Sequence, residues 1–168
     1  MEKTVQFFTM EIKMYSFSYW KNYLERKGVS FSEEPFIPFM ILWMSYNSFY
    51  NKLDNRCGDR RKACKIGEDE KAIEIFERRK NNFLNDFKNI AQNSDVRLCV
   101  INMQNRNRNV YFDNNHCDIK DFLSAVYQVR CNLFHGDKTP YWDADVRLVS
   151  WAYNSLYALL HEYKPDLF

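Results

Sequence analysis

Chain-breaking residues are scarce in this sequence, and their scarcity constrains the fold more than any other feature. Only four glycines and four prolines occur among 168 residues. Between them, apolar side chains recur every three or four positions, the spacing that gathers them on one face of an α-helix. A chain of this length can also bury a core without disulfides or metal ions. We therefore predict a single all-α domain over residues 1–168, an up-and-down bundle of about five main helices.

The two N-terminal helices differ in their apolar pattern. The first is expected over about residues 8–27, with Gly28 as its stop. The second begins after the acidic and proline residues at 32–35, which suit a helix N-terminus, and continues to about residue 53. Because this second helix is apolar on nearly every face, we expect it in the middle of the bundle or at a subunit interface.

Three further helices complete the predicted bundle. One spans about residues 69–92, and the next begins at the N-cap Asp118 and ends before Gly136. Asp143 is expected to cap a last helix that continues to about residue 163. Each carries an apolar stripe at helical spacing, so each should bury one face.

Polar segments separate these helices. Residues 55–67 are basic and contain two glycines, residues 102–115 are rich in asparagine, and residues 137–142 follow a glycine, so all three are predicted as loops. The mainly apolar residues 96–101 fit a short strand and an additional helical turn equally well, and the sequence leaves that choice open.

Charge and cysteine content exclude several classes of protein. Lys and Arg total 24 against 22 for Asp and Glu, so composition alone does not indicate a nucleic-acid binder. Basic clusters at Arg60 and Arg61, and at Arg78 and Arg79, are solvated faces or, if the fold makes them contiguous, candidate RNA contacts. Five cysteines at irregular spacings indicate neither a disulfide framework nor a zinc site.

The remaining expectations concern location and cofactors. The N-terminus lacks the pattern of a signal peptide, and the longest apolar run is too short to span a bilayer. We therefore expect a cytoplasmic protein without a membrane segment, and no metal or other cofactor.

One pair of residues carries the strongest functional signal. Arg130 and His135 stand five positions apart on the penultimate predicted helix. A permanently charged Arg suits phosphate binding, and a His can move a proton near neutral pH. On one helix, however, five positions correspond to about 140° of rotation and about 7.5 Å of rise, so the side chains diverge. If the two cooperate, a second copy of the helix or the following loop must complete the site.

The segment around this pair resembles a known signature. It reads Val129-Arg130-Cys131-Asn132-Leu133-Phe134-His135-Gly136. This is similar to the motif of the HEPN superfamily, in which an Arg and a His are separated by four to six residues. Many members carry a stretch close to Val-Arg-Asn-Asn-Leu-Phe-His-Gly, which differs from this one only at Cys131.

The resemblance implies a helical bundle that forms a homodimer, with the two Arg/His helices facing each other. It also implies a metal-independent endoribonuclease that leaves 2′,3′-cyclic phosphate and 5′-hydroxyl ends. In that role His135 is the general acid or base, and Arg130 holds the scissile phosphate. Such proteins are often toxins or defence effectors that pair with an antitoxin or a nucleotidyltransferase.

Further residues have expected supporting roles. The residue after the family's Arg is usually polar and here is Cys131, so Asn132 is expected to supply the missing hydrogen-bonding group. Lys138, Tyr141 and Trp142 follow the His in a loop that would border the cleft, where they could contact RNA. Alternatively, the two aromatic residues pack under the last helix. The alternative function is a non-catalytic HEPN-like module that binds protein, nucleotide or nucleic acid.

Overall fold

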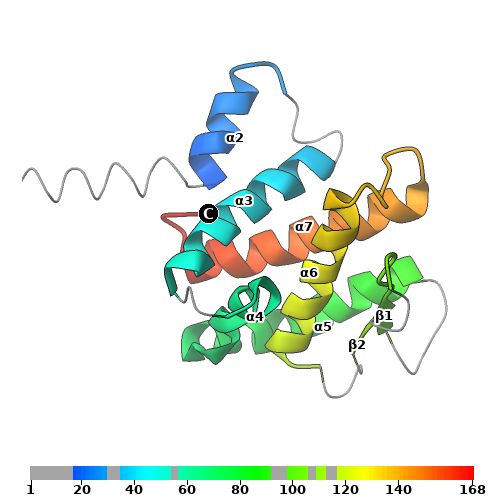
Figure 1. Cartoon of the computed structure of the whole chain (residues 1–168). Coiled ribbons are helices and arrows are strands. Elements are labelled where there is room, and N and C mark those ends of the chain that lie inside the picture. The colour runs from blue at the N-terminus through cyan, green and yellow to red at the C-terminus, as the bar shows by residue number, and fades with distance from the viewer. Residues whose placement is uncertain (1–16, 30–34, 54–56, 92–97, 106–108, 113–116) are drawn as a thin grey trace, which may run out of the picture.

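The computed structural model describes residues 17–29, 35–53, 57–91, 98–105, 109–112 and 117–168. The all-α class is confirmed, with a two-stranded hairpin added to the helices (Figure 1). In chain order the elements are α2 (Phe17–Glu25), α3 (Phe36–Leu53), α4 (Asp59–Ala63), the 3-10 helix η1 (Lys65–Glu68), α5 (Glu70–Ala91), β1 (Leu98–Val100), β2 (Val110–Phe112), α6 (Ile119–Phe134) and α7 (Asp143–Tyr163).

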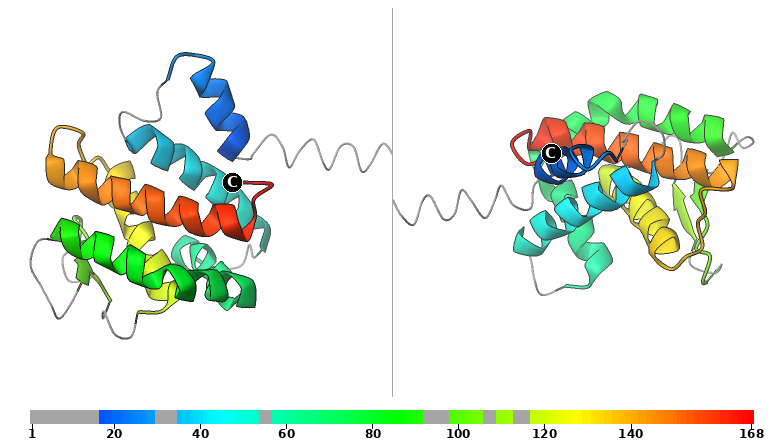
Figure 2. Two further views of the ribbon diagram at one scale, coloured as in Figure 1. Left: turned by 180° about the vertical axis from the view of Figure 1, so that it is seen from behind. Right: turned by 90° about the horizontal axis from the view of Figure 1, so that it is seen from above.

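Helix α7 forms the centre of the bundle. Figure 2 shows α3, α7 and α5 side by side, and α7 packs against both neighbours. Helix α6 crosses this layer and contacts α5 and α7 (Figure 1). On α7, Val149, Ala152, Leu156, Leu159 and Leu160 have no exposed area, because they fall on the faces turned toward the neighbouring helices.

Aromatic side chains fill the junction of α5, α6 and α7. The rings of Phe83 and Phe122 stack with centroids 5.2 Å apart, and those of Phe87 and Trp151 meet edge to face at 4.6 Å. The indole nitrogen of Trp151 donates a 2.9 Å hydrogen bond to the Phe83 carbonyl. This junction therefore buries four aromatic side chains from three helices and satisfies the indole nitrogen of Trp151.

Two predicted loops contain regular structure. Residues 55–67 include α4 and the start of η1, because Ala63 and Ile66 are buried and the Tyr46 hydroxyl donates to the Ala63 carbonyl. The predicted loop 102–115 includes β2, and residues 98–100 form the strand that pairs with it. In both places tertiary packing outweighs a polar local composition.

The helix ends agree only in part with prediction. Helix α2 begins at Phe17, and the predicted residues 8–16 lie outside the described part of the chain. Gly28 and Gly136 adopt positive φ angles of 81° and 79°, as their expected roles at helix ends require. Asp118 is the N-cap of α6, but Asp143 is the first residue of α7 and Trp142 precedes it as the cap.

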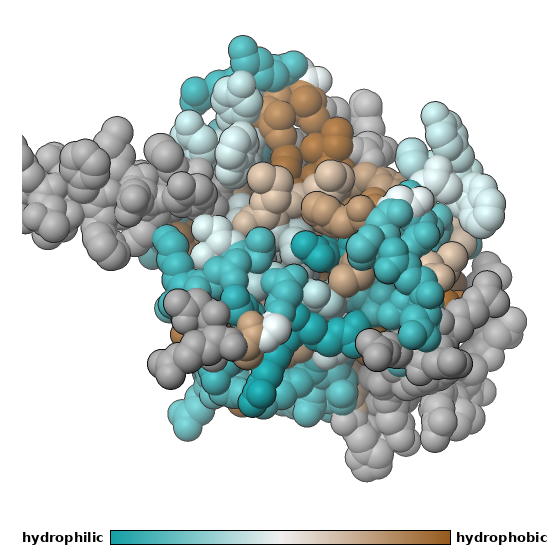
Figure 3. Space-filling view, viewed as in Figure 1, coloured by the Kyte–Doolittle hydropathy of each residue, from teal (hydrophilic) through white to brown (hydrophobic). Residues whose placement is uncertain are grey.

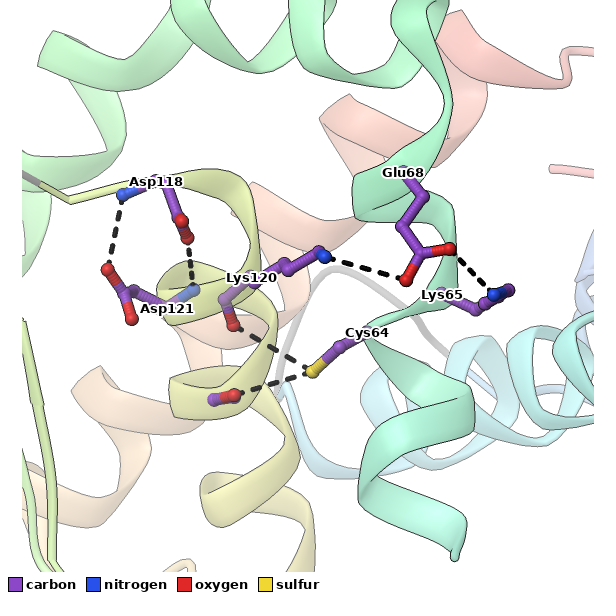
Figure 4. A network of polar contacts seen from close by, with 7 residues as sticks. Cys64, Lys65, Glu68, Asp118, Lys120 and Asp121 are labelled. Carbon is purple, nitrogen blue, oxygen red and sulfur yellow. Dashed lines mark hydrogen bonds and ion pairs between the residues drawn. The ribbon is translucent and has the colours of Figure 1, made fainter. Parts of the chain in front are cut away.

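A polar network fixes η1 and the preceding residue Cys64 along the N-terminal half of α6 (Figure 4). The Cys64 thiol lies 3.3 Å from the Ser124 hydroxyl, and Lys120 Nζ lies 3.5 Å from Glu68 Oε1. Gly67 packs so closely that a Cβ there would lie 2.8 Å from Lys120 Cγ. Because this close contact holds η1 on α6, the preceding helix α4 is placed beside the second half of α6.

Candidate functional site

Arg130 lies at the junction of α3, α4 and α6. Its side chain is 23% exposed, and its guanidinium lies over the rings of Trp43, Tyr127 and Phe134 at centroid distances of 5.8, 5.8 and 4.8 Å. A guanidinium over aromatic faces is stabilised by the negative potential of the rings. The Nε atom is buried without a hydrogen-bond partner among the described residues. Arg130 is thus held in place mainly by aromatic contacts.

Asp59 on α4 is the carboxylate that faces this arginine. Its Oδ2 lies 3.9 Å from Arg130 Nη1 and accepts a 3.2 Å hydrogen bond from the Tyr127 hydroxyl. Its Oδ1 accepts a 3.0 Å bond from the Tyr50 hydroxyl. Burial, with the negative charge of Asp59 added, raises the pKa of Tyr50, and burial also raises the pKa of Tyr127. Both hydroxyls therefore remain protonated and continue to donate to Asp59.

His135 opens onto a different region from Arg130. It is exposed at the C-cap of α6 and borders a cavity of about 130 Å³. The lining residues do not include Arg130, so the two side chains diverge as helix geometry predicts. The cavity is lined by Arg60, Asn102, Gln104, Gln128, Cys131, Asn132 and His135. Of the predicted site residues, the structure therefore brings Arg60, Cys131, Asn132 and His135 together.

A chain of side-chain hydrogen bonds forms one wall of this cavity. Arg60 Nη2 donates to Gln128 Oε1 at 2.5 Å, and Gln128 Nε2 donates to Asn132 Oδ1 at 3.0 Å. Asn132 Nδ2 then donates to the Ile101 carbonyl at 2.7 Å, and its Oδ1 also accepts from the Met103 amide at 3.3 Å. Gln128 and Asn132 are each 2% exposed. The Asn132 amide is engaged by the segment after β1, so it holds that segment against α6.

The loop after His135 is fixed by an internal ion pair. Lys138 Nζ lies 2.5 Å from Asp145 Oδ1, with side-chain exposures of 11% and 7%. Asp145 Oδ2 also accepts a 3.1 Å hydrogen bond from the Thr139 amide. Lys138 therefore stabilises the loop from within. Tyr141 and Trp142 are 91% and 68% exposed, so the alternative that they pack under the last helix is wrong.

The second basic cluster, Arg78 and Arg79, lies near the end of α7. Arg78 forms an ion pair with Glu162 near the end of α7, and Arg79 Nε lies 2.8 Å from the same carboxylate. The hydrogen bond from Arg79, followed by the charge of both arginines, lowers the pKa of Glu162. Neither arginine lines the His135 cavity, and neither does the exposed Arg61. The four predicted basic contacts therefore do not form one site around His135.

Several residues around the motif were missed in the sequence. Tyr127 and Gln128 lie one helical turn before Cys131 and Asn132, so the face of α6 could have indicated them. Asp59 had no such signal, because it lies in a segment predicted as a loop.

Comparison of the chain with protein-family models, with curated proteins and with solved structures found no match. Across the described ranges, every helix is too short or too polar to cross a bilayer. The same residues contain no group of three or more His, Cys, Asp or Glu arranged to hold a metal ion.

Proposed function

We propose that this protein is a metal-independent endoribonuclease of the HEPN type that acts as a homodimer. The observation that carries the proposal is the Arg130 to His135 motif on the penultimate helix of an all-α bundle, with an exposed His at the helix end. We further propose that it is a toxin or defence effector. In that role it would work with an antitoxin or a nucleotidyltransferase partner.

The proposed dimer explains how the diverging side chains of Arg130 and His135 could form one site. If two α6 helices meet about a two-fold axis, Arg130 of one subunit can approach His135 of the other. Helix α3 supports this arrangement, because Ile37, Met40 and Met44 on its outer face are 40%, 38% and 51% exposed. Phe134, which packs on Arg130, is 44% exposed. Figure 3 shows apolar side chains gathered over α3, and a second copy would cover such a surface.

The proposed chemistry needs only these two side chains and the RNA. His135 accepts the proton of a ribose 2′-hydroxyl, and the 2′-oxygen forms a bond to the adjacent phosphorus. The bond from phosphorus to the 5′-oxygen breaks, and that oxygen takes a proton from solvent. Arg130 stabilises the negative charge that grows on the phosphate oxygens. The products are a 2′,3′-cyclic phosphate and a 5′-hydroxyl.

A second candidate function is a helical module that binds nucleic acid, nucleotide or protein without cleavage. The surroundings of Arg130 favour it, because aromatic rings and Asp59 already engage the guanidinium. The neighbouring position is occupied by Cys131, whose Sγ lies 3.9 Å from Arg130 Nη1. In this reading Arg130 stabilises the junction of α3, α4 and α6.

A cleavage assay separates the two functions. The purified protein should cut single-stranded RNA in the presence of EDTA and leave 2′,3′-cyclic phosphate ends. DNA of the same sequence should remain intact, because the reaction uses the 2′-hydroxyl as the nucleophile. RNA that stays intact in EDTA and with added divalent ions, yet shifts in a gel with the protein, would identify the module instead.

A further inference from the structure

Arg60 differs from Arg130, Lys138 and Arg79 in its charge balance. Arg130 faces Asp59, Lys138 is paired with Asp145, and Arg79 is paired with Glu162. Within the described part of the chain, no carboxylate forms an ion pair with Arg60. Among these residues, its guanidinium donates a hydrogen bond to the neutral amide of Gln128. The positive charge of Arg60 is therefore available to a ligand.

The same side chain is held in a fixed position. The Gln128 oxygen that accepts from Arg60 belongs to a side chain 2% exposed, and that side chain is oriented in turn by Asn132. The guanidinium also lies over the Tyr127 ring, 5.2 Å from its centroid. A cation fixed before a ligand arrives loses less conformational entropy on binding, so this arrangement favours affinity.

The cavity that Arg60 borders has the composition of an anion site. Its lining includes two side chains that can carry positive charge, Arg60 and His135. The rest of the described lining consists of amides and one thiol, with no carboxylate to repel a negative ligand. The volume of about 130 Å³ is many times the roughly 15 Å³ that one water molecule needs, so a phosphate group can enter.

We propose that the cavity between Arg60 and His135 binds a phosphate group of the RNA backbone. This proposal rests on the proposed function and adds to it. Each His135 would be served by Arg60 of its own subunit, which positions the strand, and by Arg130 of the other subunit, which stabilises the reacting phosphate. Because Arg60 holds a phosphate in the bound substrate and in the transition state alike, it is a binding residue.

Inorganic phosphate is the probe that tests this site without any cleavage. In NMR titrations of the full chain, phosphate should shift the imidazole signals of His135 and leave those of His161, at the far end of α7, nearly unchanged. Arg60→Gln should weaken phosphate binding about tenfold to a hundredfold, because a hydrogen bond between charged groups is lost. Arg61→Gln is the matched control, since Arg61 is exposed on the same short helix and does not line the cavity.

Arg60→Lys guards against a folding defect, because it keeps the charge while it loses the planar fork that binds Gln128. Its affinity for phosphate should lie between those of the wild type and Arg60→Gln. Equal shifts at His135 and His161, or equal affinity in the Arg60→Gln and Arg61→Gln variants, would overturn the proposal. Suppose that cleavage depends on Arg130 and His135 while Arg60→Gln leaves the KM for RNA unchanged. That result would overturn the proposed role of the cavity but not the proposed nuclease. If the protein binds phosphate in the cavity but never cuts RNA, the phosphate site is supported and the proposed nuclease activity is wrong.

Discussion

Replacement of either Arg130 or His135 by alanine should lower the rate of RNA cleavage by about 10²-fold to 10⁴-fold. His135→Ala removes the proposed acceptor of the 2′-hydroxyl proton, and because this side chain is exposed, its loss should leave the fold intact. Arg130→Ala removes the charge that we propose stabilises the phosphate in the transition state. Initial rates on a defined single-stranded RNA in EDTA measure both effects.

His161→Ala is the matched control for this experiment. His161 is also exposed and also lies near a helix end, but it stacks on Tyr157 in the last turn of α7, at a centroid distance of 5.3 Å. Its replacement should leave the cleavage rate unchanged. Arg130 is half-buried among aromatic rings, so Arg130→Lys provides a variant that keeps the charge and loses the planar fork. Cleavage at wild-type rates in both alanine variants would show that the proposed site is wrong.

Replacement of Asp145 by alanine should destabilise the protein by about 3–5 kcal/mol, because Lys138 would remain as a buried charge without a partner. A loss of that size is a large part of the free energy of unfolding of an ordinary domain, which is about 5–15 kcal/mol. The loop that carries the exposed Tyr141 and Trp142 would also lose the contact that Asp145 makes with the Thr139 amide. Urea denaturation monitored by circular dichroism measures the change.

Asp143 offers the control for this stability measurement. It lies two residues earlier on α7 and is exposed, so Asp143→Ala should cost about 1 kcal/mol or less through the lost charge at the helix N-terminus. The double variant Lys138→Met with Asp145→Leu removes both charges together and should recover most of the stability. If Asp145→Ala unfolds at the same urea concentration as Asp143→Ala, the ion pair does not stabilise the loop as described.

The long helices could be predicted from sequence because their signals are local. Helix α6 has a capping residue at Asp118, apolar positions at helical spacing and a glycine at its end, and all three act within a few residues of chain. The two strands could not be predicted from the sequence, because a three-residue strand depends on a partner that lies ten or more residues away. Val100 and Val110 are buried only when the pair is formed and placed on α6.

In the candidate site, too, the features set by local sequence could be predicted and those set by distant contacts could not. The divergence of Arg130 and His135 depends only on helix geometry, so it could be predicted from their spacing. The position of Arg60 could not, because it depends on α4 and on the close contact of Gly67 with Lys120. Lys138 also shows the limit of composition as a guide, since a lysine beside two aromatic residues fits RNA binding and is held instead by a buried carboxylate.

A heterodimer of two inactive variants tests the composite site most directly. Co-expression of Arg130→Ala and His135→Ala chains with different affinity tags, followed by two successive affinity steps, isolates the mixed dimer. If each site takes Arg130 from one subunit and His135 from the other, one of its two sites is intact, so it should cut RNA at about half the wild-type rate. A mixed dimer as inactive as its two parents, or a failure of the two chains to purify together, would contradict the composite site.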